Sequence, residues 1–177
     1  MAGPRCDSMA GKAVQAGDRG IVFDLAHEPE PAELMRFYDR QQHATTQSVE
    51  KLSRMIAESF CLVTARKDGE LIGMARGVTD GVRGQLVECK LDPSWQGPAC
   101  VTHTDGRIEH DSAGIAREMA LRVIEAFEKH GVERVDVIAH ETEEDFCRAL
   151  GFKRAGGLVA MTLDPQSRRQ PADVDCG

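Results

Sequence analysis

Hydrophobic positions in the first half of the chain follow a strand period, then a helix period, then a strand period again. Leu52, Met55 and Ile56 lie at i, i+3 and i+4, which is typical of an amphipathic helix with one buried face. Asp-Gly pairs at 68–69 and 80–81 stand between apolar runs and predict hairpin turns. The predicted elements are a strand at Ile21–Leu25, helices at Ala32–Gln41 and Ser48–Ser59, and strands at Phe60–Ala65, Glu70–Thr79 and Gln85–Leu91.

The second half alternates helices with strands. Met119, Val123 and Phe127 recur every four residues in a long amphipathic stretch, and Gly131 follows it as a C-terminal glycine. The predicted elements here are a helix at Gly114–His130, a strand at Arg134–Ala139, a helix at Thr142–Leu150 and a last strand at Lys153–Leu163. This order predicts an α+β fold, with a mixed, mostly antiparallel central sheet flanked by helices on both faces.

Chain length, net charge and cysteine content limit the domain organisation, the partners and the compartment that we expect. The chain of 177 residues suits one domain, which we expect at 20–163 between disordered tails at 1–19 and 164–177 that show no periodicity. The net charge of −7 and the scattered basic residues argue against nucleic acid as a partner, and no apolar run is long enough to span a membrane. Six cysteines without a CxxC pair and without a signal peptide predict reduced thiols in a cytoplasmic protein.

Five segments follow one another in an order that is specific to one family: Glu70–Gly81, Leu91–Gly97, Gly114–Met119, Phe146–Phe152 and Met161–Leu163. In this order they resemble the third strand and following turn, the end of the fourth strand, the start of the central helix, a late helix and the final strand of the GNAT superfamily of N-acetyltransferases. The family places a glycine-rich loop at a helix N-terminus, where backbone N–H groups and the helix dipole meet the pyrophosphate of coenzyme A.

The resemblance implies a donor, an acceptor and a set of binding residues. The donor is acetyl-CoA, the acceptor is a small-molecule or peptide amine, and the protein is a candidate homodimer. The residues that match the family's cofactor-binding positions are Cys89, Lys90, Leu91, Gln96, Gly97, Gly114, Ile115, Ala116 and His140.

The chain departs from the family pattern in the pyrophosphate loop. Pro98 follows Gln96 and Gly97, and the helix-opening Gly114 comes only after an insertion at about 98–113. Asp111 stands where the family has Gln or Arg, and a carboxylate there repels a pyrophosphate unless it turns away. Around an Asp-Gly pair at 105–106 the insertion predicts a β-hairpin with His103 and His110 on one face. A metal site is one interpretation of the two histidines, and a solvated hairpin over the cofactor site is the favoured one.

Candidate catalytic residues follow from the same resemblance. Glu88 lies on the fourth strand, where the family often has an acidic residue, and is the candidate general base; a solvent-facing strand glutamate is the alternative. Cys147 occupies the position of the Tyr that acts as the general acid in the family, and is therefore the candidate acid. A buried cysteine that only packs in the core is the alternative. Tyr38, the only tyrosine, is expected to line the substrate groove, unless it simply packs. His140 is either a contact to the cofactor or a structural histidine.

The sequence therefore predicts an N-acyltransferase that moves an acetyl or short acyl group from acyl-CoA to an amine by direct attack. Backbone N–H groups near Lys90 and Leu91 would polarise the thioester carbonyl. The alternative is a degenerate GNAT fold that has lost or altered CoA binding and acts as a binding or regulatory module. The interrupted loop, Asp111 and the missing Tyr favour that alternative.

Overall fold

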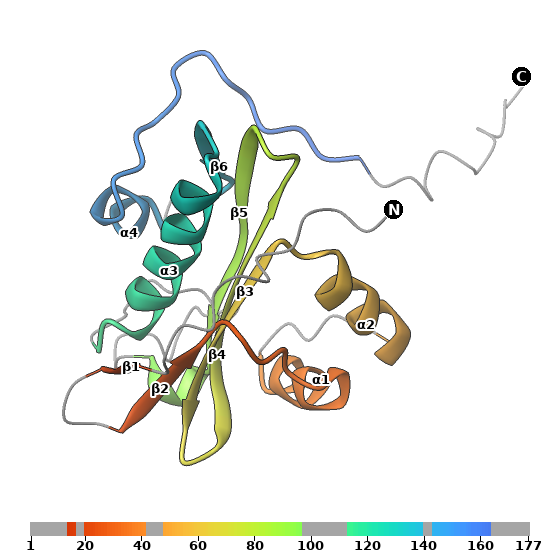
Figure 1. Ribbon diagram of the computed structural model, residues 1–177. Coiled ribbons are helices and arrows are strands. Elements are labelled where there is room, and N and C mark those ends of the chain that lie inside the picture. The colour runs from red at the N-terminus through yellow and green to blue at the C-terminus, as the bar shows by residue number, and fades with distance from the viewer. Residues whose placement is uncertain (1–13, 17–19, 42–47, 97–112, 140–142, 164–177) are drawn as a thin grey trace, which may run out of the picture.

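A single mixed sheet forms the centre of the computed structural model, which describes residues 14–16, 20–41, 48–96, 113–139 and 143–163 (Figure 1). Within these ranges the sheet has six strands in the order β1-β2-β3-β4-β5-β6. All neighbouring strands are antiparallel except β5 and β6, which are parallel. The strands are β1 Val14–Ala16, β2 Ile21–Asp24, β3 Cys61–Lys67, β4 Glu70–Thr79, β5 Arg83–Leu91 and β6 Arg134–Val137.

Helices cover both faces of the sheet, as the sequence predicts (Figure 1). On one face, α1 (Pro31–Asp39) and α2 (Val49–Glu58) bury Leu34, Phe37 and Leu52 against β4 and its neighbours. On the other face, α3 (Ile115–His130) packs a larger core around Met119, Val123 and Phe127, and α4 (Glu144–Ala149) packs against the edge of that core. The predicted α+β class and the two-sided arrangement are confirmed.

Local sequence explains where several elements begin and end. The Ser48 hydroxyl accepts a hydrogen bond from the Lys51 N–H and caps α2. Gly131 ends α3 with a φ of 81°, a conformation that costs glycine little. Asp68 and Gly69 have φ of 51° and 85°, as expected for the two-residue turn between β3 and β4.

Glycines let α3 lie close to the sheet. A Cβ added at Gly77 would lie 2.5 Å from Phe127 Cζ and 2.8 Å from Val123 Cγ1. A Cβ at Gly73 would lie 2.8 Å from Met119 Cε, and one at Gly84 would lie 3.1 Å from the Phe127 ring. Real Cβ atoms do not approach other atoms as closely as 2.5 Å, so the position of α3 over Gly77 requires a glycine there, whereas the end of the Met119 side chain and the Phe127 ring could adjust slightly at Gly73 and Gly84.

The predicted last strand at Lys153–Leu163 is wrong. These residues follow α4 without strand pairing, and Leu158, Val159, Met161 and Leu163 are 67%, 82%, 91% and 61% exposed. A segment with alternating apolar residues forms a strand only where a neighbouring strand is available to pair with its backbone. Here the segment runs past the ends of β6 and β5 (Figure 1).

The prediction of a disordered tail at 1–19 needs a correction too. Val14–Ala16 forms β1 and pairs with Ile21–Phe23 of β2. Three residues are too few to show a period in the sequence, and the strand exists because β2 offers its outer edge for backbone pairing. Other predicted boundaries shift by a few residues: β5 begins at Arg83, β6 ends at Val137, and α4 begins at Glu144.

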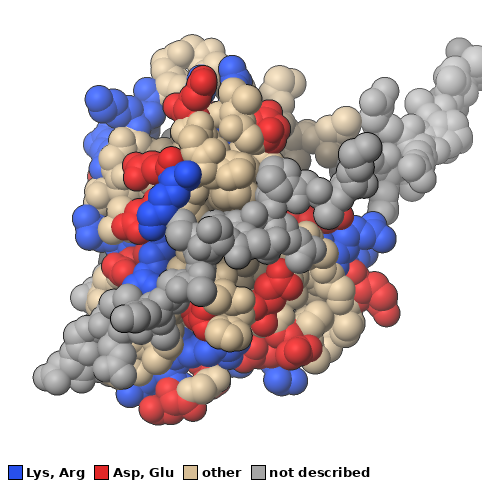
Figure 2. Space-filling model, in the orientation of Figure 1, with Lys and Arg blue, Asp and Glu red and all other residues tan. Residues whose placement is uncertain are grey.

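Two further features of the described residues bear on partners. Among their helices, none is long and apolar enough to cross a membrane. On the face shown in Figure 2, Lys and Arg side chains lie among Asp and Glu side chains instead of gathering in one area.

Candidate active site

The parallel pair β5 and β6 separates part-way along its length. Pairing joins Arg83–Leu86 of β5 to Arg134–Val137 of β6 and then stops. β5 continues to Leu91 and pairs there with β4. Because successive N–H groups of a strand point to alternate sides, the stretch after Leu86 directs part of its N–H groups away from β4.

A β-bulge sits where the two strands part. Gly77 pairs with Leu86 and Arg76 pairs with Glu88, so Val87 is an extra residue in β5. Leu86 belongs to the core under α3, and Cys89 also faces α3, where its Sγ lies 3.4 Å from the Ala116 carbonyl oxygen. The extra residue therefore turns Glu88 toward α1 and α2, on the opposite face of the sheet.

Glu88 is held on that face by two donors from different elements. The Tyr38 hydroxyl, on α1, lies 3.1 Å from both carboxylate oxygens. Arg76 Nε, on β4, donates to Oε2 over 3.1 Å. The side chains of Arg76 and Glu88 are 14% and 21% exposed, so the pair is largely shielded but reaches solvent.

Tyr38 acts as a donor in this cluster. Burial, then the charge of Glu88 and the hydrogen bond to it, raise the pKa of Tyr38 well above its ordinary value. The phenol therefore keeps its proton at neutral pH. Its single O–H can form a hydrogen bond to one carboxylate oxygen at a time. Met55 Sδ on α2 lies 3.8 Å from the same hydroxyl, and Lys90 Nζ lies 5.8 Å from the centroid of the Tyr38 ring.

The N-terminus of α3 approaches β5 through the contact between Cys89 and Ala116. Gly114 precedes the helix with a φ of 71° and provides no side-chain cap. Ile115 and Ala116 are buried, so their side chains belong to the core while their backbone N–H groups belong to the first turn. This turn is a site where an anion could be held by backbone N–H groups and the helix dipole.

Buried polar groups fix the chain as it leaves β5. The Asp92 carboxylate accepts hydrogen bonds from Arg40 Nε at 2.6 Å and from the Ser94 N–H and hydroxyl at 3.0 and 2.6 Å. Burial alone would raise the pKa of Asp92, but these hydrogen bonds and the charge of Arg40 outweigh burial and lower it. Gln96 Nε2 donates to the Leu91 carbonyl over 2.8 Å, while its buried Oε1 has no partner among the described residues.

Cys147, the candidate acid, is a buried thiol on α4. Burial, followed by the negative charges of Glu143 and Glu144, raises its pKa, so the thiol stays protonated at neutral pH. Its own carbonyl ends α4 by accepting hydrogen bonds from the Leu150 and Phe152 N–H groups. Both the acid interpretation and the packing interpretation are compatible with this position.

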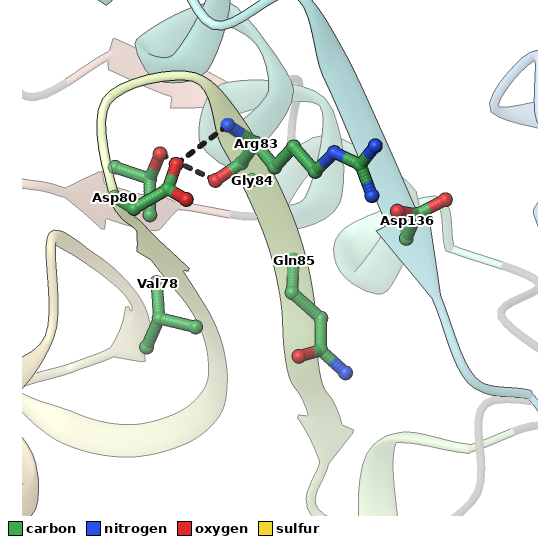
Figure 3. Close-up of a pocket in the computed structure, with 7 residues that line it drawn as sticks. Val78, Asp80, Arg83, Gly84, Gln85 and Asp136 are labelled. Atoms are coloured by element: carbon green, nitrogen blue, oxygen red, sulfur yellow. Dashed lines mark hydrogen bonds between the residues drawn. The ribbon is translucent and has the colours of Figure 1, made fainter.

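A pocket opens near the turn between β4 and β5, at the other end of β5 from Lys90 (Figure 3). Its residues come from the turn and three strands: Val78, Thr79, Asp80, Arg83, Gly84, Gln85 and Asp136. The Asp80 carboxylate accepts from the Val82 and Arg83 N–H groups, and Asp136 pairs with Arg134. Both carboxylates of this pocket thus already have partners within the protein, Asp80 in the turn and Asp136 on β6.

Some predicted site residues lie outside the described ranges. They are Gly97, His140, and the insertion with His103, His110 and Asp111. Within the described residues, no group of three or more His, Cys, Asp or Glu side chains could hold a metal ion.

Solved structures share this overall fold. A probable acetyltransferase from methicillin-resistant Staphylococcus aureus is similar over 81% of this chain and 98% of its own, with a TM-score of 0.63 and 15% identity. A GNAT-family acetyltransferase from Streptococcus pneumoniae is similar over 81% and 99%, with a TM-score of 0.59 and 17% identity.

The chain has the GNAT acetyltransferase fold. An aminoglycoside acetyltransferase from an uncultured soil sample, solved with sisomicin, has the same GNAT fold with a TM-score of 0.58 and 14% identity over 83% of this chain and 99% of its own. No protein-family model and no curated protein sequence matches the chain.

Within the GNAT fold, the structure brings together several residues that the sequence singled out separately. Glu88 and Tyr38 form one cluster on the face of α1 and α2, and Cys89 and Ala116 meet on the face of α3. Sequence reasoning missed Arg76. The signal that could have found it is a charged residue inside an otherwise buried strand, because such a charge needs a partner.

Proposed function

We propose that this protein is an N-acyltransferase that moves an acetyl or short acyl group from acyl-CoA to an amine. The observation that carries the proposal is the Glu88 carboxylate, fixed by Tyr38 and Arg76 at the point where β5 leaves β6. The fold alone is shared by proteins of many substrates, so the argument rests on this cluster.

The start of α3 suits the phosphates of coenzyme A. Gly114 adds no side chain in front of the helix, and a Cβ there would meet no atom within 4 Å. The first N–H groups of α3, at Ile115 and Ala116, would hold the pyrophosphate. The bound acyl-CoA would supply a thioester, and N–H groups of β5 between Glu88 and Leu91 that point away from β4 would hydrogen-bond its carbonyl oxygen.

Glu88 suits the amine. A carboxylate has about four acceptor positions, and Tyr38 and Arg76 fill two of them. The remaining positions would bind the acceptor ammonium and take a proton from it, directly or through water. The N–C bond then forms as the C–S bond breaks. Of the two protons the nitrogen loses, one goes to the leaving thiolate and one to solvent.

Cys147 is our candidate for the group that protonates the thiolate, because it occupies the position of the Tyr that acts as the acid in the family. Its raised pKa keeps a proton on the sulfur at neutral pH. The acceptor is an amine of small size or on a peptide. Proteins with this fold include an enzyme solved with the aminoglycoside sisomicin and a glucosamine-6-phosphate N-acetyltransferase. These acceptors belong to those proteins, and they support amine acylation here only as a class.

Binding of acetyl-CoA tests the proposal first. For a Kd of about 1 µM, about 1 mM acetyl-CoA stabilises the folded chain by about 4 kcal/mol and raises Tm by several degrees. Transfer is then measured by mass spectrometry of N-acetyl products, since the protein's own thiols would disturb a thiol-release assay. A Tm that does not move in millimolar acetyl-CoA would contradict acyl transfer and favour the alternative, a GNAT-fold binding or regulatory module.

A further inference from the structure

Lys90 places a cation beside the candidate base. It follows Glu88 by two positions on β5, so both side chains lie on the face of the sheet that α1 and α2 cover. Its Nζ lies 5.8 Å from the centroid of the Tyr38 ring, whose hydroxyl donates to Glu88. Among the described residues, Lys90 forms no ion pair. The Lys90 side chain is of intermediate exposure, lies over an aromatic face and has no counter-ion among the residues that the structure describes.

The charges around Glu88 do not cancel. Glu88 contributes one negative charge, and Arg76 and Lys90 contribute two positive charges within the same cluster. An acceptor that brought only an ammonium would add a further positive charge to a partly shielded site, which is unfavourable. An acceptor that also carried an anion would give Lys90 a counter-ion, which the described part of the chain does not provide.

We propose that the acceptor is an amine with a carboxylate or phosphate close to its nitrogen, bound with the ammonium at Glu88 and the anion at Lys90. Side chains two positions apart on one strand face start about 7 Å apart, a spacing that an amino acid or an amino alkyl phosphate spans with one charged group toward each. This inference rests on the acyl-transfer function proposed above and names the class of acceptor for the same site.

Matched acceptor pairs test the anion directly. Phenylalanine, glutamate and glycine are compared with their C-terminal amides, and O-phosphoethanolamine with ethanolamine, in acetyl transfer from acetyl-CoA. The amide forms replace the α-carboxylate by a neutral group, so the ratio of kcat/KM for acid over amide reports the effect of the anion, and the Lys90 variants below separate it from the accompanying change in amine basicity. We expect a ratio of about tenfold or more for at least one acid or for the phosphate. The two arms distinguish a carboxylate from a phosphate.

Three variants connect this ratio to Lys90. Lys90→Met keeps most of the length of the side chain and removes the charge, so the ratio falls toward one. Lys90→Arg restores a cation and most of the ratio. Lys129→Met removes a lysine of α3 that is 60% exposed on the other side of the sheet and leaves the ratio unchanged.

Three results would each overturn the inference. They are equal rates for both members of every pair, faster transfer to the neutral members, and a ratio that does not change in Lys90→Met. The absence of transfer to any anionic acceptor by protein that acetyl-CoA stabilises against heat would overturn it too. Failure of acetyl-CoA to bind would instead overturn the proposed function, and the thermal measurement separates that result from the others.

Discussion

Glu88 shows how much of a residue's chemistry is decided by partners far away in the sequence. Its hydrogen-bond donors come from α1 and β4, at separations of 50 and 12 residues. The sequence indicates an acid on the fourth strand of a family-like pattern, and so it could predict the residue. It could not predict that a protonated tyrosine and an arginine fix its carboxylate, because those contacts depend on how α1 packs on the sheet.

Replacement of this carboxylate gives the first prediction. Glu88→Gln keeps the size of the side chain and its place on β5 opposite Arg76, but it removes the carboxylate that accepts the proton. The kcat for acetyl transfer should therefore fall about 100-fold or more. Acetyl-CoA should still raise Tm, because the start of α3 is untouched.

Glu70→Gln is the matched control, since Glu70 is a β4 glutamate whose side chain is 67% exposed. Its activity should equal that of the unmodified protein. Equal activity of the Glu88 variant would show that Glu88 is only a strand glutamate.

Asp92 gives a prediction about pH. Its folded-state pKa is lowered from the ordinary 3.8 by the hydrogen bonds of Ser94 and Arg40 and by the charge of Arg40, which together outweigh the effect of burial. A lowered pKa means that the ionised form stabilises the folded state above pH 3.8, and that this contribution is lost as pH falls further through the folded-state pKa. Asp92→Asn should therefore reduce the free energy of unfolding by about 2 kcal/mol at pH 7.

The measurement is urea unfolding of both proteins at pH 7 and at the lowest pH where both remain folded. The difference between them should shrink at the acidic end, because the unmodified protein loses the Asp92 contribution there. A difference that stays constant down to pH 3 would show that the Arg40 pair contributes little.

At the scale of elements, hairpins were the easiest features to predict. Two-residue Asp-Gly turns act locally, so their residues alone determine them, and the turn at Asp68 has the positive φ that the pair predicts. The segment at Lys153–Leu163 shows the opposite case. Its alternating apolar residues suit a strand, but a strand needs a neighbour, and no local pattern shows whether that neighbour is in place.

The packing of α3 on the sheet can be tested at one glycine. A Cβ at Gly77 would overlap the Phe127 ring at 2.5 Å, and an aromatic ring in a full core cannot yield without moving α3. Gly77→Ala should lower the free energy of unfolding by about 2 kcal/mol in urea titration. Gly156→Ala, at a position where a Cβ meets no atom within 4 Å, should change it by less than about 0.5 kcal/mol. Similar values for the two variants would mean that α3 lies farther from the sheet.

The whole molecule has two cores of different size on the two faces of its sheet. The core under α3 joins residues of β2, β3, β4 and β5, and the smaller one joins α1 and α2 to β3 and β4. Hydrophobic period predicted the helices that contribute to these cores, because each of them is amphipathic. It also predicted a strand at Lys153–Leu163, whose large apolar side chains the structure leaves exposed.

Two methionines test the difference in burial between the core under α3 and the exposed segment after α4. Met119 is fully buried in the core under α3, whereas Met161 is 91% exposed. Met119→Ala should lower the free energy of unfolding by about 3 kcal/mol, and Met161→Ala by less than about 0.5 kcal/mol. Thermal and urea unfolding of the pair measure both values. A cost of about 2 kcal/mol at Met161 would place the segment in a packed strand after all.

Val87 separates the face that a residue of β5 takes from its number in the sequence. It is 37% exposed, and because it is the extra residue of the bulge, Leu86 and Glu88 lie on opposite faces although two positions separate them. If β5 took Val87 into a regular strand, Glu88 would move to the face of Leu86 and every later residue of β5 would exchange faces. The thiol of Cys89 would then stand on the side of Tyr38, and the carboxylate on the side of α3. Loss of Val87 with the pairing to β4 kept would instead remove the bulge and leave Glu88 opposite Arg76. The local conformation of one valine therefore decides which chemistry faces α1, without a change in any functional residue.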